Sequence, residues 1–244
     1  MSVALGKRVR VLVTGFGPFP GIERNASEAL VLSVGRSEAP PRLDVATAII
    51  PVAWAEARSF ARRAIAGFEP HAVLHFGVSK RAATFEIETR AFNRSGPKED
   101  AAGVVRPAAP LIHAGRPVFK SSLPPLALLR ALRASGYPAE LSRDAGRYLC
   151  NAVFYWSLAD GEAHGRLVSF IHMPALGAAA EVRPRLTMDE AVDAARILVR
   201  ASAEAVLTAK QGSAAARGGR NGDGSQSIHG NGRGGRRAVW RVAG

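Results

Sequence analysis

One cysteine and one histidine in this chain have the residue types and positions for thiol hydrolase chemistry. Cys150 is the single cysteine among 244 residues, so it cannot form an internal disulfide, and one thiol is too few for a thiolate metal site. It is therefore either an inert buried thiol or a nucleophile that needs a base. His172 follows an apolar run further along the chain and is the candidate base.

The elements expected around Cys150 favour the nucleophile. Residues 138–141 predict a short strand, Ala145-Gly146 predicts a turn, and the apolar stretch from Tyr148 to Leu158 predicts a helix. Cys150 would then lie in the first turn of that helix, where unpaired backbone N–H groups and the helix dipole stabilise a thiolate. On these features alone both interpretations of Cys150 stay open, because free cysteines are often buried.

Composition predicts a globular protein without a membrane anchor. The chain is 47% apolar and long enough to bury a large core within one domain. It has no apolar run of about 20 residues, the length that spans a bilayer, and its first residues lack the apolar segment of a signal peptide. Together with the single cysteine, these features predict a cytoplasmic protein with no membrane partner, no metal and no cofactor.

The composition changes near Ala209. From Lys210 to Gly244 the chain is rich in Gly and Arg and carries seven Lys and Arg against one acid, a large share of the net charge of +13. Such a segment has too little apolar surface to offset its ordering entropy. We therefore expect an α/β catalytic domain at residues 1–208 and a disordered basic tail at 209–244. Nucleic acid could bind only through this tail, and a solvated terminus without a partner is the alternative.

Upstream of the tail, strand and helix signals alternate. Strands are expected at 9–14, 45–52, 72–76, 84–92 and 167–171. Helices are expected from Asn25 to Val34, over 57–68 and 126–132, and from Thr187 to about Thr208. This order predicts a single-domain α/β fold, a three-layer αβα sandwich around a mostly parallel sheet. Ligand sites in such folds lie at the carboxyl ends of strands, where residues 15–19, 77–79 and 172–174 fall.

Four segments resemble, in order and approximate spacing, the motifs of the pyroglutamyl peptidase I family, the pyrrolidone-carboxylate peptidases. They are Val11–Phe19 with Asn25-Ala26-Ser27, the Glu-x-x-Ala-x-Asn segment Glu88–Asn93, the segment Ser142–Asn151 around Cys150, and His172-Met173-Pro174. The resemblance covers residues 7–208. It implies a thiol peptidase that removes an N-terminal pyroglutamyl residue from peptides, and a homo-oligomer, since family members are often tetramers.

The resemblance also implies a catalytic triad. Cys150 would be the nucleophile, His172 the general base, and Glu88 the carboxylate that orients the histidine. Glu86 is the rival for the third role, because it lies two residues away and therefore on the same face of its strand. The match through Ala91 and Asn93 selects Glu88. The alternative for His172 is a hydrogen-bonded core histidine at a strand end.

Substrate recognition is expected to rest on aromatic rings. Phe16 and Phe19 match the family positions that contact the flat, neutral lactam ring, although ordinary core packing would also explain them. The chain departs from the family at Val78, where a Gly-Arg pair is missing nearby, at Thr89, where arginine is usual, and at Lys98, which lacks the planar fork of an arginine. Two alternative functions follow: a related thiol amidase acting on another cyclic or small amide, and a non-enzymatic protein with a nucleic-acid-binding tail.

Overall fold

The computed structural model describes residues 8–19, 21, 23–175, 186–218 and 239–240. Its strands are β1 (Val9–Phe16), β2 (Leu43–Ile50), β3 (Ala72–Ser79), β4 (Phe85–Glu88), β5 (Arg90–Phe92), β6 (Val118–Lys120), β7 (Ala139–Ser142), β8 (Leu167–Pro174) and β9 (Val239–Trp240). Its helices are α1 (Ala26–Arg36), α2 (Ala57–Phe68), α3 (Pro125–Ala134), α4 (Leu149–His164) and α5 (Met188–Gly218).

Seven of the strands form one sheet in the order β7-β4-β8-β3-β1-β2-β9. Its centre is parallel, because β3 pairs in parallel with both β1 and β8, and β1 with β2. At one side β4 runs antiparallel to β8 and carries β7 in parallel beside it. The sheet is therefore mixed but mostly parallel, as the alternation of strands and helices predicts.

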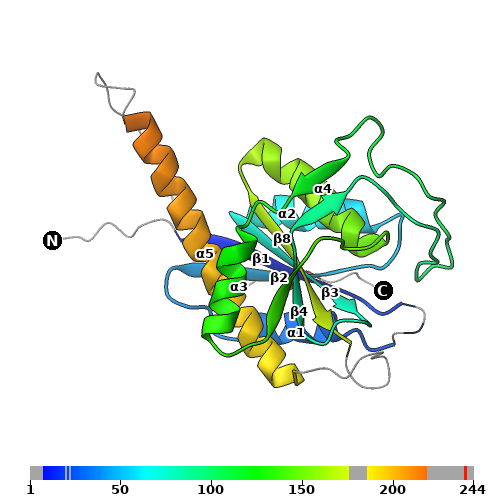
Figure 1. Ribbon diagram of the computed structural model, residues 1–244, viewed down its shortest axis with the longest axis horizontal. Helices are drawn as coiled ribbons and strands as arrows, with labels where there is room; N and C mark the ends of the chain where they lie inside the picture. The colour runs from blue at the N-terminus through cyan, green and yellow to red at the C-terminus, as the bar shows by residue number, and fades with distance from the viewer. Residues whose placement is uncertain (1–7, 20, 22, 176–185, 219–238, 241–244) are drawn as a thin grey trace.

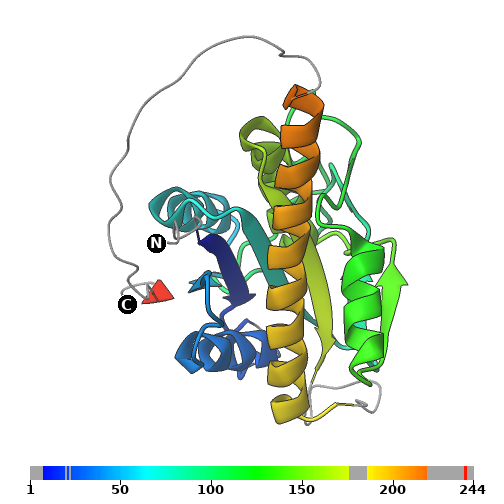
Figure 2. The same ribbon diagram turned by 90° about the vertical axis from the view of Figure 1, so that its left-hand side faces the viewer.

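Helices cover both faces of this sheet (Figures 1 and 2). Helices α1, α3 and α5 pack on one face, while α2 and α4 pack together on the other. Strand β1 serves both layers, because Val11 and Val13 point into one core and Leu12 into the other. The expected single-domain, three-layer α/β sandwich is confirmed. Within the described residues no helix combines the length and apolar character needed to cross a membrane.

The predicted starts of two helices are confirmed by their caps. The Asn25 side chain accepts a hydrogen bond from the Ser27 N–H and opens α1. Before α5, the Thr187 hydroxyl accepts from the Glu190 N–H at 3.3 Å, and the Glu190 carboxylate accepts from the Thr187 N–H at 2.7 Å. This reciprocal arrangement is a capping box and fixes where the long helix begins.

Two sequence expectations differ from the structure. The single strand expected over 84–92 is broken at Thr89 into β4 and β5, and β5 pairs with β6 outside the main sheet. The last helix, expected to end near Thr208, continues to Gly218, and β9 pairs in parallel with β2. Alanine-rich sequence at 214–216 has high helix propensity and accounts for the extension. The remaining parts of the expected tail, 219–238 and 241–244, lie outside the described residues.

Candidate active site

Three sequence-predicted residues meet beside the carboxyl ends of the central strands. Cys150 is the second residue of α4, in the first helical turn as expected. His172 lies near the end of β8, and Glu88 ends the neighbouring strand β4. The antiparallel register of β4 and β8 brings these two strands together over Glu86–Glu88, so residues more than eighty positions apart become neighbours.

The histidine and the glutamate are joined directly. His172 Nδ1 lies 2.8 Å from Glu88 Oε1, and the two residues are 7% and 0% exposed. Burial on its own would lower the pKa of His172, but the adjacent Cys150 sulfur and Glu88 carboxylate outweigh it and raise that pKa. With Nδ1 held by Glu88, the Nε2 atom is the ring nitrogen that remains for Cys150.

Glu86 lies beside this pair but does not share its bond. It faces His172 directly across the β4–β8 ladder and lines the same pocket. Burial raises the pKa of the Glu86 carboxyl above its ordinary value, with further contributions from Glu88 and Glu140 against an opposing one from His172. The geometry therefore places Glu88 rather than Glu86 on the histidine.

Carboxylate oxygens and a ring nitrogen of Glu86, Glu88 and His172 lie within 4.8 Å of one another, which is the donor set of a possible metal site. The bond between Glu88 and His172 already occupies one oxygen and one nitrogen of that set. Cys150 and Glu88 both act on His172 and raise its pKa. We therefore interpret the group as part of a proton-transfer system.

The turn before the cysteine helix is fixed from two sides. Asp144 accepts two hydrogen bonds from Arg94 at 3.0 and 3.1 Å, and one from the Gly146 N–H at 3.0 Å. One residue after the cysteine, the Asn151 side chain bonds both backbone groups of Phe92 and the Arg94 carbonyl. These bonds tie the start of α4 to the loop after β5, so Cys150 has a defined position.

A glycine makes room for the thiol. A Cβ atom on Gly77 would lie 2.7 Å from the Phe170 ring and 3.1 Å from Cys150 Sγ. Gly77 is also the register partner of His172 on β8. Any side chain at position 77 would therefore push on the sulfur or on the ring that packs beside the histidine. The sequence motif after β3 indicated a site residue but not this steric role.

Cys150 and His172 line a pocket of about 440 Å³ that also includes Phe16, Phe19 and Val78. Phe16 is only 3% exposed and its ring centroid lies 6.2 Å from that of Phe170, so it is both a core residue and a pocket wall. Phe19 is less buried, with its ring 6.3 Å from Tyr148. Both expected aromatic residues thus reach the pocket, and for Phe16 the core interpretation holds as well.

Two asparagines of the matched motifs brace loops through their side chains, and one of them, Asn25, also lines the pocket. Asn93 bonds Ile112 through both its N–H and carbonyl groups and also reaches the Gly115 carbonyl. Asn25 donates to the Gly17 carbonyl at 2.8 Å, which braces the loop that carries Phe19. Both asparagines belong to the matched motifs, and the sequence gave no sign that their side chains brace loops.

The three departures from the family pattern lie in different places. Val78 and Lys98 line the pocket, and the Lys98 ammonium sits 4.6 Å from the Tyr148 ring centroid and 5.4 Å from that of Phe19. Thr89 is outside the pocket lining. Its hydroxyl donates to the Ser142 carbonyl at 2.8 Å and ties β4 to β7. Only the first two changes therefore lie in the pocket lining.

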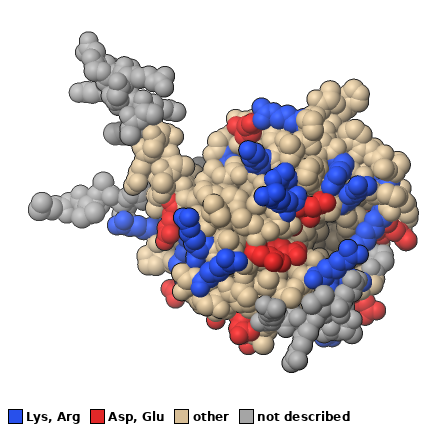
Figure 3. Space-filling view, in the orientation of Figure 1, with Lys and Arg blue, Asp and Glu red and all other residues tan. Residues whose placement is uncertain are grey.

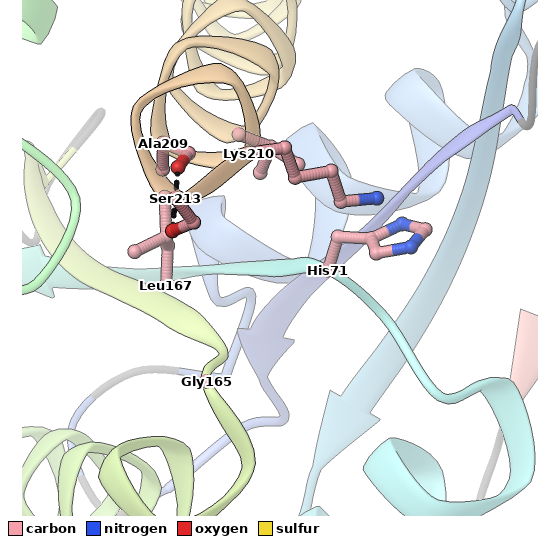
Figure 4. Close-up of a pocket in the computed structure, with 7 residues that line it drawn as sticks. His71, Gly165, Leu167, Ala209, Lys210 and Ser213 are labelled. Atoms are coloured by element: carbon pink, nitrogen blue, oxygen red, sulfur yellow. Dashed lines mark hydrogen bonds between the residues drawn. The ribbon is translucent and has the colours of Figure 1, made fainter. Parts of the chain in front are cut away.

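A second cavity, of about 380 Å³, lies at the opposite edge of the sheet (Figure 4). It is lined by His71 at the start of β3, Leu167 at the start of β8, and the α5 residues Val206, Ala209, Lys210 and Ser213, together with Gly165. The side chains of His71 and Lys210 extend in the same direction there. The cavity has no thiol and lies at the amino ends of parallel strands, away from the usual ligand edge.

Comparison with known proteins places this site in a family. The sequence profile described as pyroglutamyl peptidase matches residues 9–206, which include all of the site. The chain belongs to the pyroglutamyl peptidase family. Members of this family are cysteine-type hydrolases, and the match runs from the first strand into α5, so the peptidase fold accounts for every element that builds the pocket.

Relatives of known name agree with this assignment to the pyroglutamyl peptidases. A pyrrolidone-carboxylate peptidase of Clavibacter michiganensis is 31% identical over 207 residues, covering 83% of this chain and 97% of the relative. One from Vibrio vulnificus is 32% identical over 188 residues, covering 75% and 87%. A mutant pyrrolidone carboxyl peptidase from Pyrococcus furiosus superposes with a TM-score of 0.76 at 25% identity, covering 80% of this chain and 99% of the structure.

Proposed function

We propose that this protein hydrolyses the amide bond that follows an N-terminal pyroglutamyl residue, with Cys150, His172 and Glu88 as its catalytic triad. The observation that carries the proposal is the joined array at the pocket wall, in which Glu88 bonds His172 and His172 adjoins the single thiol of the chain. Pyrrolidone-carboxylate peptidases among the relatives support the substrate class.

In the first half of the reaction, His172 takes the thiol proton and the Cys150 sulfur attacks the pyroglutamyl carbonyl carbon. A carbon–sulfur bond forms and the carbonyl oxygen becomes an oxyanion. As the oxyanion collapses, the carbon–nitrogen bond breaks, and His172 gives its proton to the departing amine. The products of this half are a pyroglutamyl thioester on Cys150 and a shortened peptide with a free amino group.

In the second half, His172 takes a proton from water and the resulting hydroxide attacks the thioester. The carbon–sulfur bond breaks, the proton returns to the sulfur, and free pyroglutamate leaves. Glu88 takes no proton in either half. Its role is to hold the His172 ring in one orientation and to stabilise the imidazolium that forms twice in each cycle.

Two further parts of the site fit this chemistry. The N–H groups that open α4 have no intrahelical acceptor, so they are the donors for the oxyanion that forms next to Cys150. Phe16 and Phe19 give the pocket flat apolar walls suited to a lactam ring that is neutral and has no free amine.

A chromogenic assay tests the proposal. Purified protein should release nitroaniline from pyroglutamyl 4-nitroanilide, while Cys150→Ser releases none above the rate without enzyme. Prolyl 4-nitroanilide is the control, because its ring has the same size but carries a charged amine and no ring carbonyl. Equal cleavage of the two anilides would show that the lactam is not recognised, and equal activity of Cys150→Ser would show that the thiol is not the nucleophile.

A further inference from the structure

The mouth of the Cys150 pocket carries more positive charge than the proposed reaction uses. Lys80, Lys98 and Arg147 all line it, as does Arg81. Lys98 and Arg147 are exposed and Lys80 is half-buried, so their charged ends lie at the rim rather than in the core. A pyroglutamyl residue is neutral, and its lactam ring offers no anion for these groups to bind.

The three cations reach the pocket from three different segments of the chain. Lys80 follows β3, and its ammonium points toward the loop after β1, where it would lie 3.8 Å from a Cβ on Gly21. Lys98 stands over the Phe19 and Tyr148 rings, at 5.4 and 4.6 Å. Arg147 precedes the cysteine helix, and its carbonyl accepts the Gly96 N–H at 2.7 Å, which places it beside the Lys98 loop.

Negative charge at the pocket does not balance them. Within the described part of the chain, neither Lys80, Lys98 nor Arg147 has a carboxylate partner within 4.0 Å. The pocket has two acids, and one of them, Asp144, is already paired with Arg94 at 3.0 Å. The other, Glu86, lies on β4 opposite His172. Figure 3 shows basic and acidic side chains interspersed on the surface that it presents.

We propose that this rim selects peptides with a carboxylate in the first or second residue after the pyroglutamyl group. The proposal rests on the proposed function, since it concerns the part of the same substrate that extends out of the pocket. The neutral ring sits between the aromatic walls, and the carbonyl of the amide bond to be cleaved lies at Cys150. The residues that follow the pyroglutamyl group must then pass out through the mouth. A carboxylate there approaches Lys80, Lys98 and Arg147, while an ammonium group meets like charge.

The carboxylate can come from two sources, an acidic side chain or the terminal carboxylate of a very short peptide, and two substrate pairs separate them. Pyroglutamyl-glutamyl-alanine amide is compared with pyroglutamyl-glutaminyl-alanine amide, which has the same shape without the side-chain charge. Pyroglutamyl-alanine is compared with its amide, which lacks the terminal charge. We expect kcat/KM to be about threefold to tenfold higher for the charged member of at least one pair, because exposed ion pairs contribute modestly.

Two further measurements connect the preference to the rim. Raising the salt concentration from about 0.05 M to about 0.5 M should reduce the preference, because the electrostatic screening length shortens as salt is added. The double variant Lys80→Gln with Arg147→Gln should bring the charged-to-neutral ratio of kcat/KM close to one. Lys210→Gln is the matched control, since it removes a lysine that lines the cavity at the opposite edge of the sheet, and it should keep the ratio of the unaltered protein.

The outcomes separate the two proposals. Cleavage of the neutral substrates with ratios near one in both pairs would overturn the rim proposal and leave the peptidase intact. A preference that survives both salt and the double variant would overturn it as well, because the selectivity would then come from elsewhere. No cleavage of any pyroglutamyl substrate would overturn the proposed function itself. A salt-sensitive ratio that is lost in the double variant and kept in Lys210→Gln supports the rim.

Discussion

Two carboxyl groups on β4 flank the proposed catalytic histidine, and their contacts assign them different tasks. Glu88 is fully buried and bonds His172 Nδ1 at 2.8 Å, whereas Glu86 is half-buried and lines the pocket. Residue type and strand face are the same for both, so the sequence pattern alone left the choice to the family match. Distance and burial now give an independent reason for choosing Glu88.

Replacing each of these glutamates separately tests the assignment. Glu88→Gln should lower kcat by about 10²- to 10⁴-fold, because the amide neither fixes the His172 tautomer nor stabilises the imidazolium. Glu86→Gln should lower kcat by less than about tenfold, because it leaves that bond in place. Steady-state kinetics on the pyroglutamyl anilide measure both, with melting curves to confirm folding. The reverse order of the two losses would transfer the orienting role to Glu86.

The two phenylalanines of the pocket should respond differently to truncation. Phe19→Ala should raise KM about threefold to tenfold, because it removes a stacking wall and little of the core. Phe16→Ala should also destabilise the fold by about 3–5 kcal/mol, because Phe16 is 3% exposed and packs on Phe170. Anilide kinetics and urea unfolding on both variants make the comparison. Equal stability losses would mean that Phe19 is as much a core residue as Phe16.

At the scale of elements, sequence periodicity located the buried parts of the fold well. Runs such as Val9–Thr14 and Leu167–Ile171 are mostly apolar and mostly buried, so they are easily seen in the sequence. The helical stripe over 57–68 was found at its observed bounds. Capping chemistry at Asn25 and Thr187 predicted two helix starts because those side chains act on their own local backbone.

Elements that depend on distant partners were not found. The break at Thr89 exists because its backbone N–H and hydroxyl both bond the Ser142 carbonyl, a partner 53 residues away. Strand β6 is three residues long and forms only through its pairing with β5. In the same way, the support of the cysteine helix by Asn151 and Arg94 involves contacts with no local sequence signal. Such pairings are set by tertiary structure.

A buried histidine in β3 should make stability depend on pH. His75 is fully buried, with Nδ1 2.7 Å from the Thr14 hydroxyl, and burial lowers its pKa to about 3. An unfolded chain protonates this ring below about pH 6.5. Between pH 6.5 and 3 the unfolded state therefore binds one more proton, and the free energy of unfolding should fall by about 1.4 kcal/mol per pH unit as acid is added. His172 affects stability in the opposite sense, because its pKa is raised on folding. Its contribution to the stability of the folded state is fully present below about pH 6.5 and is lost as pH rises.

Urea unfolding between pH 7 and 5 tests the role of His75. The His75→Gln variant should have lower stability at pH 7 but a shallower loss toward acid, because position 75 no longer titrates. His164→Gln is the control, since it removes a histidine whose side chain is 58% exposed, and it should keep the slope of the unaltered protein. An unchanged slope in His75→Gln would mean that other groups cause the acid sensitivity.

At the scale of the whole molecule, the three layers explain why one edge of the sheet carries the chemistry. Parallel strands β1, β3 and β8 end together, so their terminal segments converge with the start of α4 and with β4. The opposite edge holds the His71–Lys210 cavity and no thiol. Fold class, site edge and triad candidates could be predicted from sequence, because strand order and motif position determine them. The charged rim could not, because Lys80, Lys98 and Arg147 become neighbours only in the folded chain.

The contribution of the C-terminal region to the stability of the molecule can be tested directly. Helix α5 runs to Gly218, although its described residues from Leu207 to Ser213 are exposed. Strand β9 has two residues and pairs with Thr47 and Ala48 of β2. A few ladder hydrogen bonds contribute about 0.5–1.5 kcal/mol each, and closing the chain between α5 and β9 costs entropy against them. The net contribution of this region to stability should therefore be small.

Truncation after Gly218 and after Gln211 should consequently leave anilide turnover unchanged and lower Tm by less than about 4 °C, the shift expected for about 1 kcal/mol in a protein of this size.

Both truncations remove the arginines from Arg220 onward, so any affinity for RNA should fall in both, and in the full chain it should weaken steeply with salt. Melting curves, the anilide assay and a filter-binding series on the three proteins make the comparison. A larger loss of Tm shared by both truncations would mean that β9 is an integral strand of the sheet, whereas a loss confined to truncation after Gln211 would assign the stability to the last turns of α5. RNA affinity that does not change on truncation would place any nucleic-acid contact on the peptidase domain.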